Sequence, residues 1–474
     1  MSTFSGLNTA TTALWAQQRG LDITGQNIAN VNTPGYTRQR AELASMGGNA
    51  IPAISAVSSN VGGGVSADSV IRIRDAFLEG RTQVEQGKNA QFTAESDALT
   101  QIEQAFREPG TTGIQSMLTD MWNGWSDVVN HPDDLAARGQ LLQRTQTLVI
   151  GMNTTSAALD KQAEQTRDNL QTLVSDVNAS AASIADLNQA IKRATQAGLP
   201  ANELADKRDA LVLTLAGKVG ATATPGEDGV VNVVVGGTTL VAGVSSLDLA
   251  LVPAAGVPGE PRIVTTTGNS TLSVGGTAAG SLTALKTTIP GYRAQLDGVA
   301  KQLVGTLNAE HAKGYDLNGQ PGRPLLDDGA GSGATAVDPA TVTAANIRLR
   351  IADPRGIAAA DLAPDATGGA SLDNDRADAI YQLRLGAGSV DSTYRAVVVN
   401  LGVNSAVAAR NLDIQSVITS QVESSRESVS GVNLDEEMTN MLSFQHAYSA
   451  AARMITAIDE ALDVLINKTG LVGR

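Results

Sequence analysis

Both ends of the chain carry apolar residues at helical spacing. Over residues 4–31, one series recurs every seven positions and a second is offset from it by three: Leu7, Leu14, Leu21 and Ile28, with Ala10, Gln17, Thr24 and Val31. Over residues 434–465, the same alternation of three and four falls on Met441, Phe444, Tyr448, Ala451, Ile455, Ile458, Leu462 and Leu465. This repeat predicts two amphipathic helices of the coiled-coil type. Neither helix buries its stripe alone, so we expect the two chain ends to pack against each other.

The middle of the chain combines helical and strand patterns. Helical spacing, broken by segments with Pro or Gly, predicts helices over residues 76–106, 114–216 with breaks at 130–134 and 197–203, 282–313, 373–384 and 391–428. Alternating valines around a Gly-Gly turn predict a β-hairpin over 229–243, with strands continuing to about 274. A further strand is predicted over 346–352.

These patterns predict a mainly α fold with β-rich insertions. We divide it into three domains. Residues 1–65 and 405–474 form the paired terminal coiled-coil helices. Residues 66–325 and 385–404 form a long helical bundle domain with a β-hairpin segment at about 220–275, and residues 326–384 form a small, variable, β-rich outer domain.

Composition excludes several classes of partner and chemistry. The net charge of -14, from 48 acidic and 34 basic residues, argues against a nucleic-acid partner bound through a broad basic surface. With no cysteine, the 474 residues hold no disulfide and no thiolate metal site. No apolar run approaches the roughly 18 residues of a membrane span, and the N-terminal residues lack the features of a cleavable signal peptide.

The sequence contains few residues in patterns typical of catalytic or metal-binding sites. The three histidines, His131, His311 and His446, are scattered, and no two of them have the spacing of metal ligands on a helix. There is no Gly-x-Ser-x-Gly elbow and no phosphate-binding glycine motif. The sequence therefore predicts no enzyme, no catalytic residue, no cofactor and no metal site.

A polar motif, QNIANVNTPGYTRQR, follows the first helical stripe over residues 26–40. Asn30 suits the end of a helix because asparagine tolerates the left-handed conformation. Pro34 favours extended geometry at Thr33, and Gly35 permits a turn that a side chain would disfavour. The motif thus predicts a helix end followed by an extended arm. That arm carries Tyr36, Arg38 and Arg40.

The motif and both chain ends resemble one family. SGLNTATTALWAQQRGLDITGQNIANVNTPGYTRQR, residues 5–40, resembles the N-terminal signature of the bacterial flagellar rod, hook and hook-associated proteins. The signature positions are occupied here by Asn27, Asn30, Asn32, Thr33, Gly35 and Tyr36. Residues 430–470 are similar to the closing helix of that family. Three middle segments, at 102–142, 175–217 and 280–319, resemble the helical domain of the members that form the hook-filament junction.

The resemblance implies a structural subunit of the bacterial flagellum, in the junction layer that joins the hook to the filament. Such a protein is secreted through the type III export apparatus and is extracellular. The implied partners are other copies of the chain in a ring or helical layer, the hook protein, the second junction protein (hook-associated protein 3), an export chaperone and the export apparatus itself. Nucleic acid, cofactors and a membrane span are not implied.

The resemblance also assigns candidate assembly residues at both ends. In the first helix and the motif these are Leu7, Leu14, Leu21, Asn27, Ile28, Asn30, Asn32, Thr33, Pro34, Gly35 and Tyr36. In the last helix they are Met441, Phe444, Tyr448, Ala451, Ile455, Ile458, Leu462 and Leu465. The alternative within the family is a hook or distal rod protein, against which the helical block at 154–217 argues. A secreted adhesin-like binding protein would explain β-rich insertions but not the terminal heptads.

Overall fold

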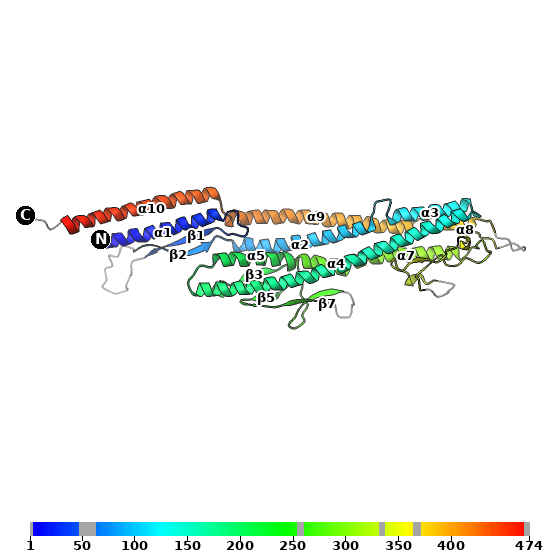
Figure 1. Ribbon diagram of the computed structural model, residues 1–474, viewed down its shortest axis with the longest axis horizontal. Coiled ribbons are helices and arrows are strands. Elements are labelled where there is room, and N and C mark those ends of the chain that lie inside the picture. Colours follow the sequence, from blue (N-terminus) through cyan, green and yellow to red (C-terminus); the bar gives the residue numbers. More distant parts are fainter. Residues whose placement is uncertain (1–2, 47–62, 254–259, 331–336, 364–370, 469–474) are drawn as a thin grey trace, which may run out of the picture. The chain divides into compact units, whose positions relative to one another are not determined.

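The computed structural model of the chain describes residues 3–46, 63–253, 260–330, 337–363 and 371–468 (Figure 1). The chain forms two compact units. Unit 1 comprises Met1–Gly87, Val177–Asp248 and Val417–Arg474, and unit 2 comprises Lys88–Asp176 and Leu249–Ser416. Both chain ends therefore belong to the same unit. The three-domain division drawn from the sequence stays a prediction.

Helices dominate both units, as predicted. Their bounds are α1 Thr3–Ala29, α2 Ala76–Phe106, α3 Ile114–Asn130, α4 Leu135–Gln196, α5 Asn202–Val219, α6 Gly276–Thr283, α7 Ile289–His311, α8 Asp375–Gln382, α9 Val390–Ser430 and α10 Leu434–Asp463. The sequence pattern predicts a single helix over 282–313, where the structure has the end of α6 and all of α7. A π-helical turn, Ala284–Thr288, separates these two helices. No helix among the described residues combines the length and apolar character of a membrane-spanning segment.

Short strands form small antiparallel sheets. Their bounds are β1 Gln39–Met46, β2 Gly64–Arg72, β3 Thr222–Pro225, β4 Val231–Val235, β5 Thr238–Ala242, β6 Ser245–Ser246, β7 Leu249–Pro253, β8 Pro261–Thr265, β9 Leu326–Asp327 and β10 Arg348–Leu349. β1 pairs with β2, β3 to β6 form one sheet in chain order, β7 pairs with β8, and β9 pairs with β10. The predicted hairpin at 229–243 is confirmed as β4 and β5.

The predicted outer domain contains less β-structure than expected. The strand predicted over 346–352 is only two residues long, and it pairs with an equally short β9. Local hydrogen bonds explain the difference, because short acidic side chains stabilise turns here instead of a strand ladder. Asp338 accepts a hydrogen bond from the Ala340 backbone N–H, and Asp353 accepts one from that of Arg355. In the described part of 326–384, β9 and β10 are therefore the extent of regular strand.

Helix termini in unit 1 follow familiar capping rules. The Asp75 carboxylate accepts hydrogen bonds from the backbone N–H groups of Phe77 and Leu78 and so caps α2. Asn433 does the same for the first turn of α10. α5 ends at Val219, and the next residue, Gly220, has a φ of 70°, a left-handed conformation that glycine adopts without strain. These signals lie close to the helix ends that the sequence pattern predicted.

Unit 2 has a continuous apolar core, and one histidine is part of it. The core packs Phe106 of α2, Trp125 of α3 and Tyr292 of α7. His311, at the end of α7, is fully buried. Its Nε2 accepts a hydrogen bond from the Ala358 backbone N–H at 2.9 Å, and its Nδ1 lies 2.6 Å from the Arg323 carbonyl, to which it donates. Burial lowers the pKa of His311 to about 4, so the ring is neutral and structural.

Candidate assembly interface

The first and last helices of the chain pack side by side in unit 1, as the heptads predicted (Figure 1). A Cβ placed on Gly6 would lie 3.4 Å from Ile458, and one placed on Gly20 would lie 2.8 Å from the ring of Phe444. Asn27 donates a hydrogen bond to Glu437 at 2.9 Å. As the residue numbers rise along α1, those of the contacting residues fall along α10, so the two helices are antiparallel.

Small residues of α1 lie where this helix meets α10. Gly6 and Gly20 contact α10 directly, and Ala13 lies on the same line, seven residues from each. The heptad pattern predicts that Leu7, Leu14 and Leu21 also face the partner helix, and this stays a prediction. Small residues let two helix backbones approach closely, and the Phe444 ring then fills the space that Gly20 leaves open.

The leucine series lies on one flank of this contact. Leu7, Leu14, Leu21 and Ile28 each follow a residue of the contact line by one position, which on an α-helix is a rotation of about 100°. The opposite flank of α1 is covered by β2, where Gly64 packs closely against Thr12. The four aliphatic residues are only partly buried within the single chain. The described residues thus leave an aliphatic stripe beside α10 incompletely covered.

The stripe of α10 is also only partly buried. Within it, Ala451 is buried, whereas Met441, Phe444, Tyr448, Ile455, Ile458 and Leu462 are half-buried. Leu465 lies in a π-helical turn after α10 and is 53% exposed. Large apolar side chains elsewhere on the same helix, Leu434, Met438 and Leu442, are exposed as well.

Asn27 is the centre of a hydrogen-bonded clasp between the motif and α10. It is 1% exposed, and its Oδ1 accepts hydrogen bonds from the Tyr36 hydroxyl at 2.8 Å and the Gln39 backbone N–H at 3.0 Å. Its Nδ2 donates to the Gln39 carbonyl and to Glu437, both at 2.9 Å. All four hydrogen-bonding positions of this side chain are therefore used, which a buried amide requires.

Glu437 is the partner of the clasp on α10. Its carboxylate is 2% exposed and receives the Arg38 guanidinium through Nε at 2.8 Å, in addition to the amide of Asn27. Arg38 also reaches Glu436, and its backbone N–H donates to the Ser430 carbonyl at 3.0 Å. A buried carboxylate is tolerable only with such partners. We refer to Asn27, Arg38 and Glu437 as the clasp.

The other motif residues shape the turn that leads into the clasp. Gly35 has a φ of +80°, as the sequence predicted, and it is exposed together with Asn32, Thr33 and Pro34. Asn30 is not in the left-handed conformation that was predicted. Its side chain instead donates to the Gln26 carbonyl and accepts a hydrogen bond from Thr33. Burial, with Asp206 and Glu437 nearby, raises the pKa of Tyr36 to about 12, so its hydroxyl remains a donor.

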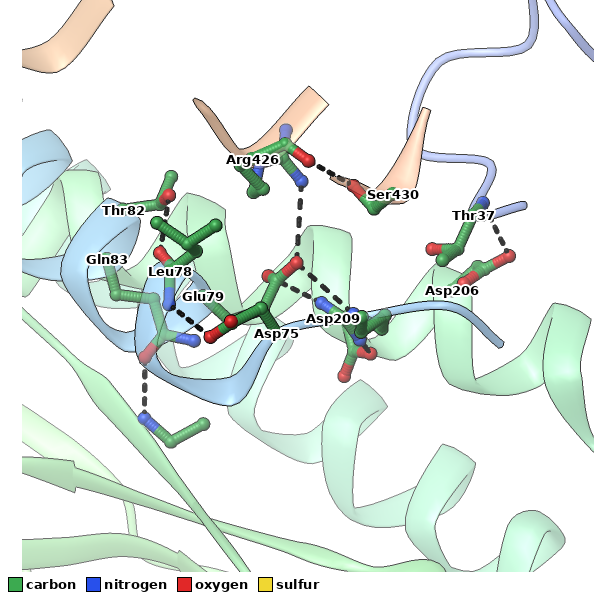
Figure 2. A network of polar contacts seen from close by, with 12 residues as sticks. Thr37, Asp75, Leu78, Glu79, Thr82, Gln83, Asp206, Asp209, Arg426 and Ser430 are labelled. Atoms are coloured by element: carbon green, nitrogen blue, oxygen red, sulfur yellow. Dashed lines mark hydrogen bonds and ion pairs between the residues drawn. The ribbon is translucent and has the colours of Figure 1, made fainter. Parts of the chain in front are cut away.

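A second polar cluster anchors the arm after the motif (Figure 2). The Thr37 backbone N–H donates to Asp206 of α5 at 3.2 Å. Arg72 lies 2.8 Å from both Asp206 and Asp209, and Asp209 also pairs with Arg74. Further members from the start of α2, from α5 and from the end of α9 are Glu79, Arg208, Arg426 and Ser430. The cluster fixes the position of the arm within unit 1.

Sequence reasoning missed several residues of this site. Glu437 precedes Phe444 by seven residues, so it occupies the same heptad series as the apolar stripe. A carboxylate at such a position signals a buried partner, and the predicted arm offered Arg38 and Arg40 as candidate cations. Gly6 and Gly20 carried a similar signal, because they fall seven residues on either side of Ala13 along one helix face.

The chain matches family models and known proteins of the bacterial flagellum. Residues 7–37 match a model described as flagella basal body rod protein, and residues 423–468 match one described as flagellar basal body rod FlgEFG protein C-terminal. Residues 99–326 match the flagellar hook-associated protein FlgK helical domain. A Bacillus subtilis (strain 168) protein named flagellar hook-associated protein 1 is 31% identical over an alignment of 526 positions, which covers 100% of both chains.

The chain belongs to the flagellar hook-associated protein 1 family.

Other comparisons agree with this family membership. Flagellar hook-associated protein 1 of Escherichia coli (strain K12) is 25% identical, over 97% of this chain and 99% of the relative. A structure titled as that of the flagellar hook junction protein FlgK from Burkholderia pseudomallei superposes with a TM-score of 0.64 at 17% identity, over 74% of this chain and 100% of the other. That likeness shows the fold alone. The resemblance read from the sequence is confirmed, and the flagellar hook-associated protein 1 family is a structural one.

Proposed function

We propose that this protein is the subunit of a hook-filament junction layer in the bacterial flagellum, where copies of the chain join the hook to the filament. The proposal rests on membership of the flagellar hook-associated protein 1 family. One observation carries its mechanism, namely the partly covered aliphatic stripe of Leu7, Leu14, Leu21 and Ile28 beside α10.

The stripe supports assembly between copies for a physical reason. Burying a leucine side chain fully contributes about 1.5–3 kcal/mol relative to leaving it exposed, and a partly covered side chain gains only a fraction of this free energy. Neighbouring copies that cover the stripe would recover the remainder at each of its four positions. The exposed residues Leu434, Met438 and Leu442 on α10 add to the same effect. The candidate assembly residues of both terminal helices are thus proposed as contacts between copies.

The proposed location and partners follow from the same layer. The subunit is secreted, lies outside the cell in the flagellum, and contacts the hook protein on one side and the second junction protein on the other. An export chaperone and the type III export apparatus act on the chain before assembly. These partners are supported by the family of the chain and not by any contact in the single subunit.

Leu14→Asp tests whether the stripe is an assembly surface. A charged side chain at this position would have to be buried between copies, so the junction layer should fail to form. Because Leu14 lies about 100° around α1 from the line of Gly6, Ala13 and Gly20, the purified chain should keep its folded helices by circular dichroism. In cells that carry only this variant, filament protein should appear in the medium as monomers, and hooks should remain bare in electron micrographs.

Gln26→Asp is the matched control, since Gln26 is an exposed residue of the same helix and lies about 120° around it from Leu14. It adds the same charge on another face and should leave filaments and swimming unchanged. Normal filaments in Leu14→Asp cells would contradict the proposed surface. Bare rods without hooks would favour the alternative, a hook or distal rod protein. Intact flagella in cells that lack the chain altogether would favour an adhesin-like secreted protein.

A further inference from the structure

The contact between α1 and α10 repeats itself along most of its length. Gly6, Ala13 and Gly20 succeed one another at intervals of seven on α1, and small or aliphatic side chains succeed one another at the same interval on α10. A contact built from such a repeat fits nearly as well after one helix slides by seven residues. The repeating contact of Gly6, Ala13 and Gly20 therefore does not select one register over another.

Two neighbouring contacts do distinguish the registers. The first is steric, since the Phe444 ring occupies the notch at Gly20 so closely that a Cβ there would lie 2.8 Å from ring carbons. The second is polar, namely the clasp of Asn27, Arg38 and Glu437. Gly20 and Asn27 are seven residues apart, as are Phe444 and Glu437, so one register satisfies both contacts at once.

A slide by one heptad in either direction destroys both contacts. One direction places Phe444 opposite Ala13, whose Cβ leaves no notch, and leaves Glu437 opposite Gly20 without a hydrogen-bond donor. The other direction places Phe444 against Asn27 and carries Glu437 beyond the end of α1 at Ala29. In each case a buried polar group loses its partners, which is strongly unfavourable.

We propose that the Asn27, Arg38 and Glu437 clasp and the Phe444 ring at Gly20 are positioning contacts that set the register of α1 against α10. A single buried polar contact fixes register in coiled coils by the same principle. The consequence for assembly rests on the proposed function. A slide of seven residues displaces α10 by about 10 Å along α1, so the faces offered to neighbouring copies no longer match.

The rival explanation is chain connectivity, because only three residues, Gly431, Val432 and Asn433, separate α9 from α10. Paired cysteines in the full-length chain distinguish the two, since the natural sequence contains no cysteine. Ala13→Cys with Ala451→Cys reports the observed register. Two further pairs report the two slipped registers: Ala13→Cys with Ile458→Cys, and Gly6→Cys with Ala451→Cys. A thiol cross-linker shorter than the displacement, applied to dilute monomer, scores each pair as an intramolecular product.

In the otherwise unchanged chain, the Ala13 and Ala451 pair should cross-link and the other two should not. Glu437→Leu combined with Phe444→Leu should raise cross-linking of a slipped pair at least tenfold and lower that of the observed pair. Glu437→Gln alone keeps an acceptor for Asn27 and should keep the observed register. Met441→Leu combined with Ile455→Leu changes the same helix at repeating positions and should also keep it.

Three results would overturn the proposal. If the Glu437→Leu and Phe444→Leu chain still cross-links only through Ala13 and Ala451, connectivity sets the register. If it cross-links through no pair, the two contacts hold the helices together and do not choose between registers. If the unchanged chain cross-links equally through all pairs, no register is selected. Because the assay uses the monomer, none of these results depends on assembly into a flagellum.

Discussion

The close contact of Gly20 with the Phe444 ring leads us to expect that Gly20→Ala destabilises the protein. Elsewhere inside a helix, replacing glycine by alanine usually stabilises it. Gly20→Ala would place a Cβ 2.8 Å from the Phe444 ring, whereas a Cβ on Gly25 of the same helix would meet no neighbouring atom within 4 Å. Replacing glycine by alanine inside a helix stabilises it by about 0.5–1 kcal/mol. Overpacking a filled contact destabilises by about 1–3 kcal/mol.

The two substitutions should therefore have opposite effects. Gly25→Ala should stabilise the pair of α1 and α10 by about 0.5–1 kcal/mol. Gly20→Ala should end about 1–3 kcal/mol less stable than Gly25→Ala, because both share the gain in helix propensity and only one meets Phe444. Hydrogen exchange of α1 amides in the full-length chain measures the difference, where about 1.4 kcal/mol corresponds to a tenfold faster exchange.

Phe444→Leu supplies the internal check of this reasoning. In the Gly20→Ala background, the smaller side chain should restore part of the lost protection, although alone it should weaken the pair. Equal protection of α1 in Gly20→Ala and Gly25→Ala chains would refute the close contact between Gly20 and Phe444. Failure of Phe444→Leu to improve the Gly20→Ala chain would show that the loss arises elsewhere in the helix.

Two further predictions concern stability within each unit. Asp209→Asn removes one largely buried carboxylate that Arg72, Arg74 and Arg208 share, and it should lower the unfolding free energy of unit 1 by about 2–3 kcal/mol in urea titrations. Asp228→Asn, an exposed control, should change it by less than about 1 kcal/mol. Equal effects of the two would contradict the anchoring role of the cluster. His311, with its pKa lowered to about 4, remains neutral in the folded chain, whereas the unfolded chain takes up a proton at this residue below pH 6.5. The stabilising contribution of His311 is therefore complete above pH 6.5 and declines as the pH falls toward 4. The wild-type chain should therefore lose ~2 kcal/mol more than His311→Gln between pH 7.5 and pH 5, and parallel pH profiles would contradict the buried neutral ring.

Helix boundaries could be predicted from the sequence because the chain marks them with strong local signals. The predicted helix over 76–106 coincides with α2, and its first turn is capped by Asp75. The strand over 346–352 could not be predicted to the same accuracy, because side-chain hydrogen bonds of the kind made by Asp353 compete with a strand ladder. Local pattern does not show which of these two outcomes prevails.

The candidate site was only partly predictable for a different reason. The motif, its turn at Gly35 and the pairing of the two terminal helices followed from residue types and spacing. The close contacts at Gly6 and Gly20 did not, because hydrophobicity ranks Leu14 above Ala13 and Gly20 although close backbone approach favours the smaller residues. The partnership of Asn27 with Glu437 joins residues 410 positions apart, and no local pattern relates them.

A cryo-electron microscopy reconstruction of intact flagella at the hook-filament junction tests the central claim most directly. The account predicts a layer of this chain between hook and filament, with α1 and α10 of each copy antiparallel in the observed register. Leu7, Leu14, Leu21 and Ile28 of every copy should be buried against neighbouring copies. A junction that lacks the chain, or a layer in which these four residues remain exposed to solvent, would contradict the account.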